Sequence, residues 1–214
     1  MSHYLTSLIM CLLLSLSLPY ASAAENSPSQ QQTILIMGDS ISAGYGIDKA
    51  QGWVSLLKTK LSSLNTKIQY KIVNSSISGE TTSGGANRIR SLLEQHNPNV
   101  VVLELGGNDG LRGSSIKLMK QNFAFMINES KKVDANILLL GMQIPPNYGL
   151  TYSNLFKDMF PKIASEHNIT LLPFLLEGIA GQPEMMQADG IHPTATAQSI
   201  MMEAVWSQLK NWIN

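Results

Sequence analysis

The segment Gly38-Asp39-Ser40-Ile41 places a serine between small residues, directly after a short apolar run. A serine at the end of a buried strand can project its hydroxyl group toward a substrate, and glycine there allows a tight turn and close approach of a ligand. Ser40 is therefore a candidate nucleophile. Loops are also rich in glycine and serine for conformational reasons alone, so this segment needs partner groups before it predicts chemistry.

A second segment near the C-terminus, Asp189-Gly190-Ile191-His192-Pro193, could supply the groups that activate a serine. Attack on an ester needs a base for the hydroxyl group, a partner that orients the base, and donors for the developing oxyanion. An aspartate and a histidine three residues apart can meet within one turn, which leaves the second imidazole nitrogen free to face Ser40. The same segment also fits an ordinary turn before the last helix.

Two further segments could provide donors for the oxyanion. Gly79 lies in the stretch 74–80, and its backbone N–H could approach a substrate closely because glycine has no side chain. Asn108 lies in Gly106-Gly107-Asn108-Asp109-Gly110, and its side-chain amide could be another donor. Each of these stretches, taken alone, also fits a flexible turn.

Apolar segments rich in β-branched residues alternate with segments of helical length along the chain. The pattern predicts strands at Thr33–Met37, Gln69–Asn74, Val100–Leu105, Ile137–Gly141 and Thr170–Pro173. It predicts helices at Trp53–Leu64, Ala86–Gln95, Ser115–Lys132, Tyr152–His167 and Thr194–Ile213. Such alternation favours a parallel sheet covered by helices on both faces. Ligands in these sheets bind beyond the carboxyl ends of the strands, so the loops after the first four strands should share one neighbourhood.

The last predicted helix has apolar residues at three- and four-residue steps, which predicts one buried face. The residues of that face are Ala197, Ile200, Met201, Ala204, Val205 and Leu209.

The N-terminus predicts export. Leu8–Leu18 is almost wholly apolar and is followed by Ala21-Ser22-Ala23, a pattern typical of a signal peptide cleaved after Ala23. A membrane anchor is the alternative, but the run is short for a span of about 20 residues. We therefore divide the chain into a signal peptide at 1–23, a flexible lead-in at 24–32 and one domain at 33–214.

The composition of the chain excludes some partners and some kinds of site. The chain has 15 basic and 15 acidic residues and no basic run, so neither a nucleic acid nor an anionic membrane surface is predicted as a partner. Cys11 is the only cysteine and falls inside the predicted signal peptide. The exported protein would then have no thiol for a disulfide, a nucleophile or a metal site.

Taken together and in this order, the four segments resemble those of the GDSL, or SGNH, hydrolases, a family named for serine, glycine, asparagine and histidine in four sequence blocks. The residue after the serine, usually leucine in that family, is Ile41 here. The resemblance covers nearly all of the predicted domain. Within the family the chain is most similar to small bacterial periplasmic enzymes described as thioesterase, protease and lysophospholipase, and to their arylesterase relatives.

The resemblance implies a flavodoxin-like three-layer α/β/α sandwich with a five-stranded parallel sheet, the SGNH hydrolase fold. It implies that Ser40 is the nucleophile, that His192 is its base and that Asp189 orients His192. The oxyanion would be held by the backbone N–H groups of Ser40 and Gly79 and by the side chain of Asn108. No metal and no organic cofactor is expected.

The function implied is a serine esterase that hydrolyses acyl esters and thioesters through an acyl-enzyme. Lysophospholipids, acyl-CoA-type thioesters and aryl esters are the expected substrates, and a periplasmic or secreted monomer is the expected form. Apolar loop residues would contact the acyl chain, namely Ile41, Leu111, Ile144 and Ile191. A carbohydrate O-acetyl esterase on the same fold is an alternative, and a binding protein without turnover is a second one.

Overall fold

The structure is a computed structural model of the chain, and it describes residues 31–213. The predicted signal peptide and nearly all of the predicted lead-in lie outside the described residues. The core is one five-stranded sheet in which all neighbouring strands are parallel, in the order β2-β1-β3-β4-β5. The strands are β1 (Gln31–Gly38), β2 (Gln69–Asn74), β3 (Val100–Glu104), β4 (Asn136–Leu140) and β5 (Thr170–Leu172).

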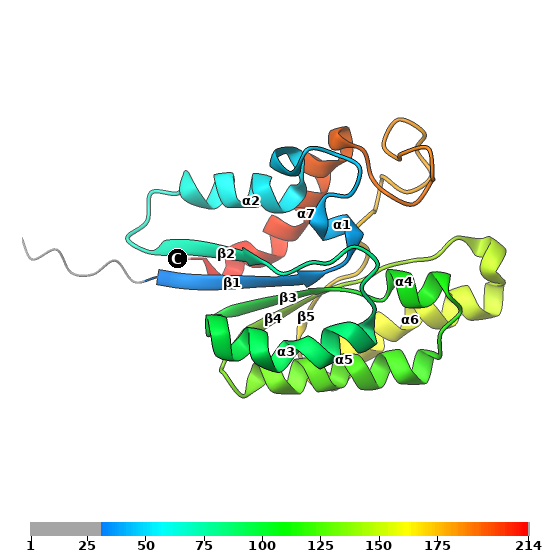
Figure 1. Cartoon of the computed structure of the whole chain (residues 1–214), viewed down its shortest axis with the longest axis horizontal. Helices are drawn as coiled ribbons and strands as arrows, with labels where there is room; N and C mark the ends of the chain where they lie inside the picture. Colours follow the sequence, from blue (N-terminus) through cyan, green and yellow to red (C-terminus); the bar gives the residue numbers. More distant parts are fainter. Residues whose placement is uncertain (1–30, 214) are drawn as a thin grey trace, which may run out of the picture.

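Helices cover both faces of this sheet (Figure 1). One face carries α2 (Trp53–Ser62) and α7 (Gln198–Leu209), and the other carries α3 (Thr82–His96), α5 (Ile116–Lys131) and α6 (Leu150–His167). The result is the predicted three-layer α/β/α sandwich. Within residues 31–213, no helix combines the length and the apolar character needed to cross a bilayer.

Six shorter helices complete the fold of the part of the chain that the structure describes. Two are single α-helical turns that follow β1 and β3 at the same edge of the sheet, α1 (Ser40–Ala43) and α4 (Gly107–Leu111). The others are 3₁₀ turns, η1 (Lys49–Gln51), η2 (Pro146–Tyr148), η3 (Ala195–Ala197) and η4 (Lys210–Trp212). The sequence analysis predicts none of α1, α4, η1 and η2, whereas η3 and η4 lie within the predicted helix Thr194–Ile213.

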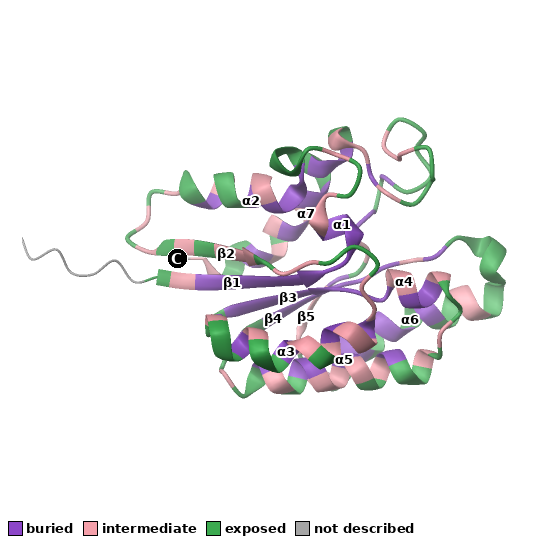
Figure 2. Ribbon diagram, in the orientation of Figure 1, coloured by how far each residue is buried: buried purple, intermediate pink, exposed green. Residues whose placement is uncertain are grey.

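The strands in the middle of the sheet are buried from both sides (Figure 2). Every residue of β3 is buried, and so are Thr33–Gly38 of β1 and Ile137–Leu140 of β4. The edge strand β2 is only partly buried. This distribution explains why the central strands are continuous apolar runs rather than alternating ones.

Three sequence predictions need correction. The first strand begins at Gln31, so the predicted lead-in overlaps β1 by two residues. The last helix is interrupted, because α7 is preceded by η3 and followed by η4. Ile200 was placed on the buried face, but it is 41% exposed. The buried residues Met201, Val205 and Leu209 follow one another along α7 in steps of four. Ile200 precedes Met201 by one residue and therefore lies on a different side of the helix.

The strand order places a crevice at one end of the sheet. The chain runs from β1 to the outer strand β2 on one side, and later strands are added on the other side, beginning with β3. In open α/β sheets the ligand site lies beyond the carboxyl ends of the strands where the order reverses. Here Gly38 at the end of β1 pairs with Glu104 at the end of β3, so α1 and α4 begin next to each other.

Candidate active site

The turn that carries Ser40 is built by its neighbours. Asp39 is the N-cap of α1, and its Oδ1 accepts a hydrogen bond of 3.0 Å from the Ile41 N–H. Ser40 is thereby the first residue of a helical turn, where backbone N–H groups have no partner inside the helix. A side chain at position 38 would not fit, because its Cβ would lie 2.7 Å from Oε2 of Glu104.

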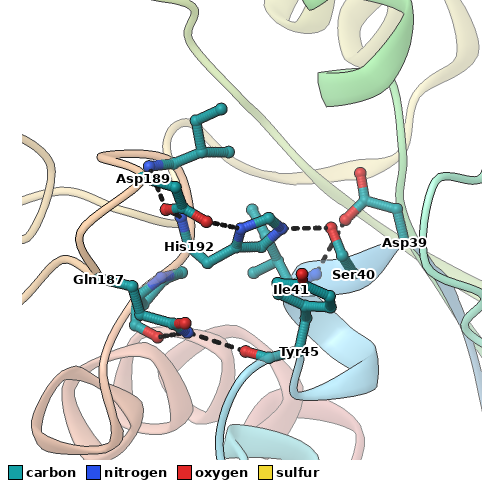
Figure 3. A network of polar contacts seen from close by, with 9 residues as sticks. Asp39, Ser40, Ile41, Tyr45, Gln187, Asp189 and His192 are labelled. Atoms are coloured by element: carbon teal, nitrogen blue, oxygen red, sulfur yellow. Dashed lines mark hydrogen bonds and ion pairs between the residues drawn. The ribbon is translucent and has the colours of Figure 1, made fainter.

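Ser40, His192 and Asp189 form a chain of short polar contacts (Figure 3). His192 Nε2 lies 2.9 Å from Ser40 Oγ, and His192 Nδ1 lies 2.6 Å from Asp189 Oδ2. With a hydrogen on Nδ1, the imidazole donates to Asp189, and its free Nε2 can accept the hydroxyl proton of Ser40. This is the arrangement that a serine nucleophile, its base and an orienting carboxylate require.

A tight hairpin presents His192. Met186 and Pro193 form an antiparallel bridge, and the Gln187 N–H donates to the His192 carbonyl oxygen at 2.8 Å. The turn closes with a hydrogen bond of 2.8 Å from the Gly190 N–H to the Gln187 carbonyl oxygen. Gly190 has a φ of +66°, a conformation that glycine adopts without strain.

Asp189 is fixed by the same hairpin. Its Oδ1 accepts hydrogen bonds from the N–H groups of Ile191 at 2.9 Å and His192 at 3.0 Å. The backbone N–H of His192, the imidazole of His192 and the N–H of Ile191 together lower the pKa of Asp189 to about 2. The carboxylate is therefore ionised at any pH at which esterases work, and both of its oxygens are committed to orienting His192.

Gln187 joins the hairpin to the segment that follows Ser40. Its Nε2 donates to the Tyr45 carbonyl oxygen at 2.8 Å and to the Pro193 carbonyl oxygen at 3.0 Å (Figure 3). The ring of Tyr45 lies 4.5 Å from the His192 ring, tilted by 39°. Gln187 and Tyr45 were not predicted as site residues, because neither residue type marks a catalytic role without a known fold.

Three donors are available for an oxyanion. Among residues 31–213, neither the Ser40 N–H nor the Gly79 N–H donates a hydrogen bond. The Asn108 amide donates one hydrogen bond of 3.0 Å to Asp39 Oδ2, which leaves its second N–H free. Gly79 lies in an exposed loop with a φ of +81°, and its carbonyl oxygen accepts a bond of 3.3 Å from Arg112.

Ser40, His192 and Asn108 open into one cavity of about 610 Å³. All four predicted acyl-contacting residues line it, namely Ile41, Leu111, Ile144 and Ile191. Other apolar parts of its wall were not predicted from the sequence, including Met142, Phe174, Leu176 and Ala180. Asp189 and Gly79 do not line this cavity: Asp189 lies behind His192, and Gly79 belongs to the neighbouring loop.

Two buried carboxyl groups, those of Asp39 and Glu104, lie next to the turn that carries Ser40. Burial raises the pKa of Asp39 to about 6. Burial also raises the pKa of Glu104 well above its ordinary value, and the negative charge of Asp39 adds to that effect. Glu104 Oε2 accepts a hydrogen bond of 2.6 Å from the Ser42 hydroxyl group. The sequence signal for this pair is a glutamate at the end of the apolar run of β3, and it was not used in the prediction.

Proteins named as esterases or thioesterases are similar to this chain over most of its length. It is 48% identical to the esterase TesA of Pseudomonas aeruginosa over 84% of this chain and 88% of that protein. It is 41% identical to an arylesterase of Vibrio mimicus over 94% of this chain and 98% of that protein. It is 40% identical to thioesterase 1/protease 1/lysophospholipase L1 of Escherichia coli K12 over 85% of each chain.

Solved structures agree with these matches. The crystal structure of TesA superposes with a TM-score of 0.82 at 47% identity, covering 85% of this chain and all of the other. The esterase EstA of Pseudoalteromonas sp., in a structure inhibited by monoethylphosphonate, superposes with a TM-score of 0.80 at 40% identity, covering 86% of this chain and 99% of the other.

The family model of the GDSL-like lipases and acylhydrolases matches residues 36–200, a span that contains Ser40, Gly79, Asn108, Asp189 and His192. The sequence resemblance to GDSL hydrolases is thus confirmed, and the chain belongs to the GDSL-like lipase/acylhydrolase family.

Proposed function

We propose that this carboxylic ester hydrolase uses Ser40 as its nucleophile and His192 as its base. The observation that carries the proposal is the unbroken chain of contacts from Ser40 Oγ through the imidazole to Asp189, at 2.9 and 2.6 Å. Ser40 attacks the acyl carbonyl carbon while His192 Nε2 takes the hydroxyl proton. Asp189 stabilises the imidazolium that forms, because it is already ionised and hydrogen-bonded to Nδ1.

The negative charge that develops on the carbonyl oxygen is stabilised by the N–H groups of Ser40 and Gly79 and by the Asn108 amide. Their free N–H groups support this role, since donors that are fixed in place before the reaction need no rearrangement during it. His192 then gives its proton to the leaving alcohol or thiol. A water molecule, activated by the same imidazole, attacks the acyl-enzyme and restores Ser40.

The substrates we propose are acyl esters and thioesters with an apolar acyl chain, including lysophospholipids and aryl esters. The relatives support this range, because they are described as an esterase, an arylesterase and a thioesterase/lysophospholipase. The cavity supports it as well. A volume of about 610 Å³ with a largely apolar wall exceeds what an acetyl group needs. A carbohydrate O-acetyl esterase, which requires a short blocked pocket, is therefore not favoured.

The test is the initial rate of the purified protein on p-nitrophenyl esters from acetyl to palmitoyl, with Ser40→Ala measured alongside. We expect a Ser40-dependent rate that is highest for intermediate or long acyl chains. A Ser40-dependent rate confined to the acetyl ester would contradict the proposed substrate class. No Ser40-dependent rate on any ester would contradict the proposed catalytic residues.

We also propose that the protein is exported as a monomer and that residues 1–23 are removed. The apolar run Leu8–Leu18 and the small residues Ala21-Ser22-Ala23 support export. N-terminal sequencing of the protein recovered from a periplasmic extract should begin at Ala24. Recovery of the intact N-terminus in the membrane fraction would favour an anchor instead.

A further inference from the structure

Glu104 is an unusual residue for its position. It ends β3, the most deeply buried strand, and its side chain has no exposed surface. Its Oε2 accepts hydrogen bonds from the Ser42 hydroxyl group at 2.6 Å and from the Asp39 N–H at 3.3 Å. Both donors belong to the turn that carries Ser40, so one carboxyl group holds that turn from the side away from the substrate.

The second oxygen of Glu104 does not stabilise the fold through a hydrogen bond. Among residues 31–213, Oε1 is buried and has no hydrogen-bond partner. A buried polar atom without a partner destabilises the folded state, and such atoms in native proteins call for an explanation. Burial raises the pKa of Glu104 well above its ordinary value, which favours the neutral acid and makes its Oε2 a carbonyl-like acceptor.

The contacts continue from Glu104 to the oxyanion donor. The Asp39 N–H is held by Glu104, while the Asp39 carboxylate accepts from the Ile41 N–H at 3.0 Å and from the Asn108 amide at 3.0 Å. Asp39 therefore fixes the start of α1 and the orientation of Asn108 together. Gly107 packs closely against it, because a Cβ at Gly107 would lie 3.3 Å from Asp39 Oδ2.

We propose that Glu104 is a positioning residue for ester hydrolysis: it holds the nucleophile turn through the Asp39 amide and the Ser42 hydroxyl group, and thereby keeps the Asp39 carboxylate against Asn108. This inference rests on the roles proposed above for Ser40 and Asn108. Glu104 touches neither the cavity nor the reacting atoms, so its effect on the rate passes through Asp39 and Asn108. A displacement of about 1 Å at a catalytic group can cost 10²-fold in rate.

The test compares Glu104→Gln with Glu104→Leu. Glutamine is neutral and retains an oxygen acceptor of the same reach, so its kcat should stay within threefold of the wild type. Leucine has a similar volume but no acceptor, so its kcat should fall ten- to a hundredfold while KM for a short ester changes less than threefold. If leucine leaves kcat unchanged, or if glutamine lowers it as far as leucine does, the proposal is wrong.

A double-mutant cycle with Asn108→Ala separates positioning from a general loss of structure. If Glu104 acts through Asn108, most of the leucine effect should disappear once the amide is gone, because interacting residues are not additive. A full ten- to hundredfold loss in the Asn108→Ala background would instead overturn the proposal.

The variant Ser42→Ala tests the same proposal if the leucine variant does not fold. It removes one of the two groups that donate to Glu104, so we expect a three- to tenfold loss of kcat. An unchanged kcat for that variant would also overturn it.

The failure of the proposed function would look different. A wild-type protein without Ser40-dependent hydrolysis overturns both proposals at once. An active wild type whose leucine variant is equally active removes only the role of Glu104.

Discussion

At the scale of single residues, Asn108 is the donor whose contribution can be removed most cleanly. One N–H of its amide donates to Asp39, and the other has no acceptor among residues 31–213. We expect Asn108→Ala to lower kcat by about 10²–10³, the usual effect of removing one oxyanion donor. Steady-state kinetics on a short p-nitrophenyl ester measures this. Asn122→Ala is a matched control, because that amide bonds to Thr82 and Ser83 and does not line the cavity.

A loss below threefold in Asn108→Ala would remove Asn108 from the oxyanion site. The Ser40→Ala protein sets the background rate for this comparison. It should remain folded, because the only hydrogen bond of the Ser40 hydroxyl group among residues 31–213 is the one with His192.

Asp189→Asn tests the orienting carboxylate. The amide would present a donor or a neutral oxygen where His192 Nδ1–H now meets a charge, so the imidazole loses both its orientation and the stabilisation of its charged form. We expect kcat to fall by roughly 10²–10⁴, with the lower end favoured because the Asp189 side chain is 39% exposed. A kcat close to that of the wild type from pH 6 to pH 9 would contradict the assignment. Asp48→Asn, at the N-cap of η1, is the matched control.

The residues of the proposed catalytic chain could be named from the sequence, whereas the residues that position them could not. Ser40, Asp189 and His192 carry functional groups whose order along the chain matches a family pattern. Glu104 and Gln187 act through contacts with residues 65 and 142 positions away, respectively, and no local pattern encodes such contacts. The sequence signal for Glu104 was a single acidic residue at the end of a buried apolar strand. Burial of such a group destabilises the folded state unless it is hydrogen-bonded or paired.

At the scale of elements, α4 places Asn108 and is packed closely on one side. A Cβ at Gly110 would lie 2.7 Å from Phe156 of α6 and 2.8 Å from Ile144 on the cavity wall. Gly110→Ala should therefore push α4 outward, destabilise the protein by about 1–3 kcal/mol as overpacking does, and lower kcat through Asn108. Urea unfolding and kinetics together measure this.

Gly52→Ala is the matched control for that change. A Cβ at Gly52 would meet the Lys49 carbonyl oxygen at 3.4 Å, an ordinary contact distance, so stability and kcat should change little. If Gly110→Ala were as stable and as active as Gly52→Ala, close packing of α4 would not be what positions Asn108.

The five strands and the long helices were predictable because burial gives them a clear pattern. Residues 100–103 of β3 and 137–140 of β4 are buried and apolar, and α3, α5 and α6 each have one apolar face. The turns α1 and α4 were missed because their residues are those of loops. Both are single turns, and position within the fold rather than helix propensity determines their conformation.

At the scale of the whole molecule, the buried carboxyl pair should make stability depend on pH. Burial raises the pKa of Asp39 from 3.8 to about 6 and that of Glu104 well above 4.5, so the folded protein binds more protons than the unfolded chain in this range. The free energy of unfolding should therefore fall as pH rises from about 4 through 6 and beyond.

Asp189 acts in the opposite direction and at lower pH. Its pKa is lowered from 3.8 to about 2, so its contribution is present above pH 4 and is lost as pH falls toward 2.

Because of the buried pair Asp39 and Glu104, urea unfolding should give a larger free energy of unfolding at pH 5 than at pH 8. Glu104→Gln cannot ionise, so the decrease between these two pH values should be smaller in that variant. An equal decrease in both proteins would show that Glu104 does not ionise on unfolding.

The distance along the chain between Ser40 and His192 also has a consequence for biosynthesis. The two side chains meet at 2.9 Å although 152 positions separate them, and His192 lies on the hairpin just before the last helix. A ribosome therefore completes the nucleophile turn long before it has made the base. Until almost the entire domain has been translated and folded, the growing chain has a serine with nothing to activate it. An esterase arranged in this way has no activity to restrain while it is being made.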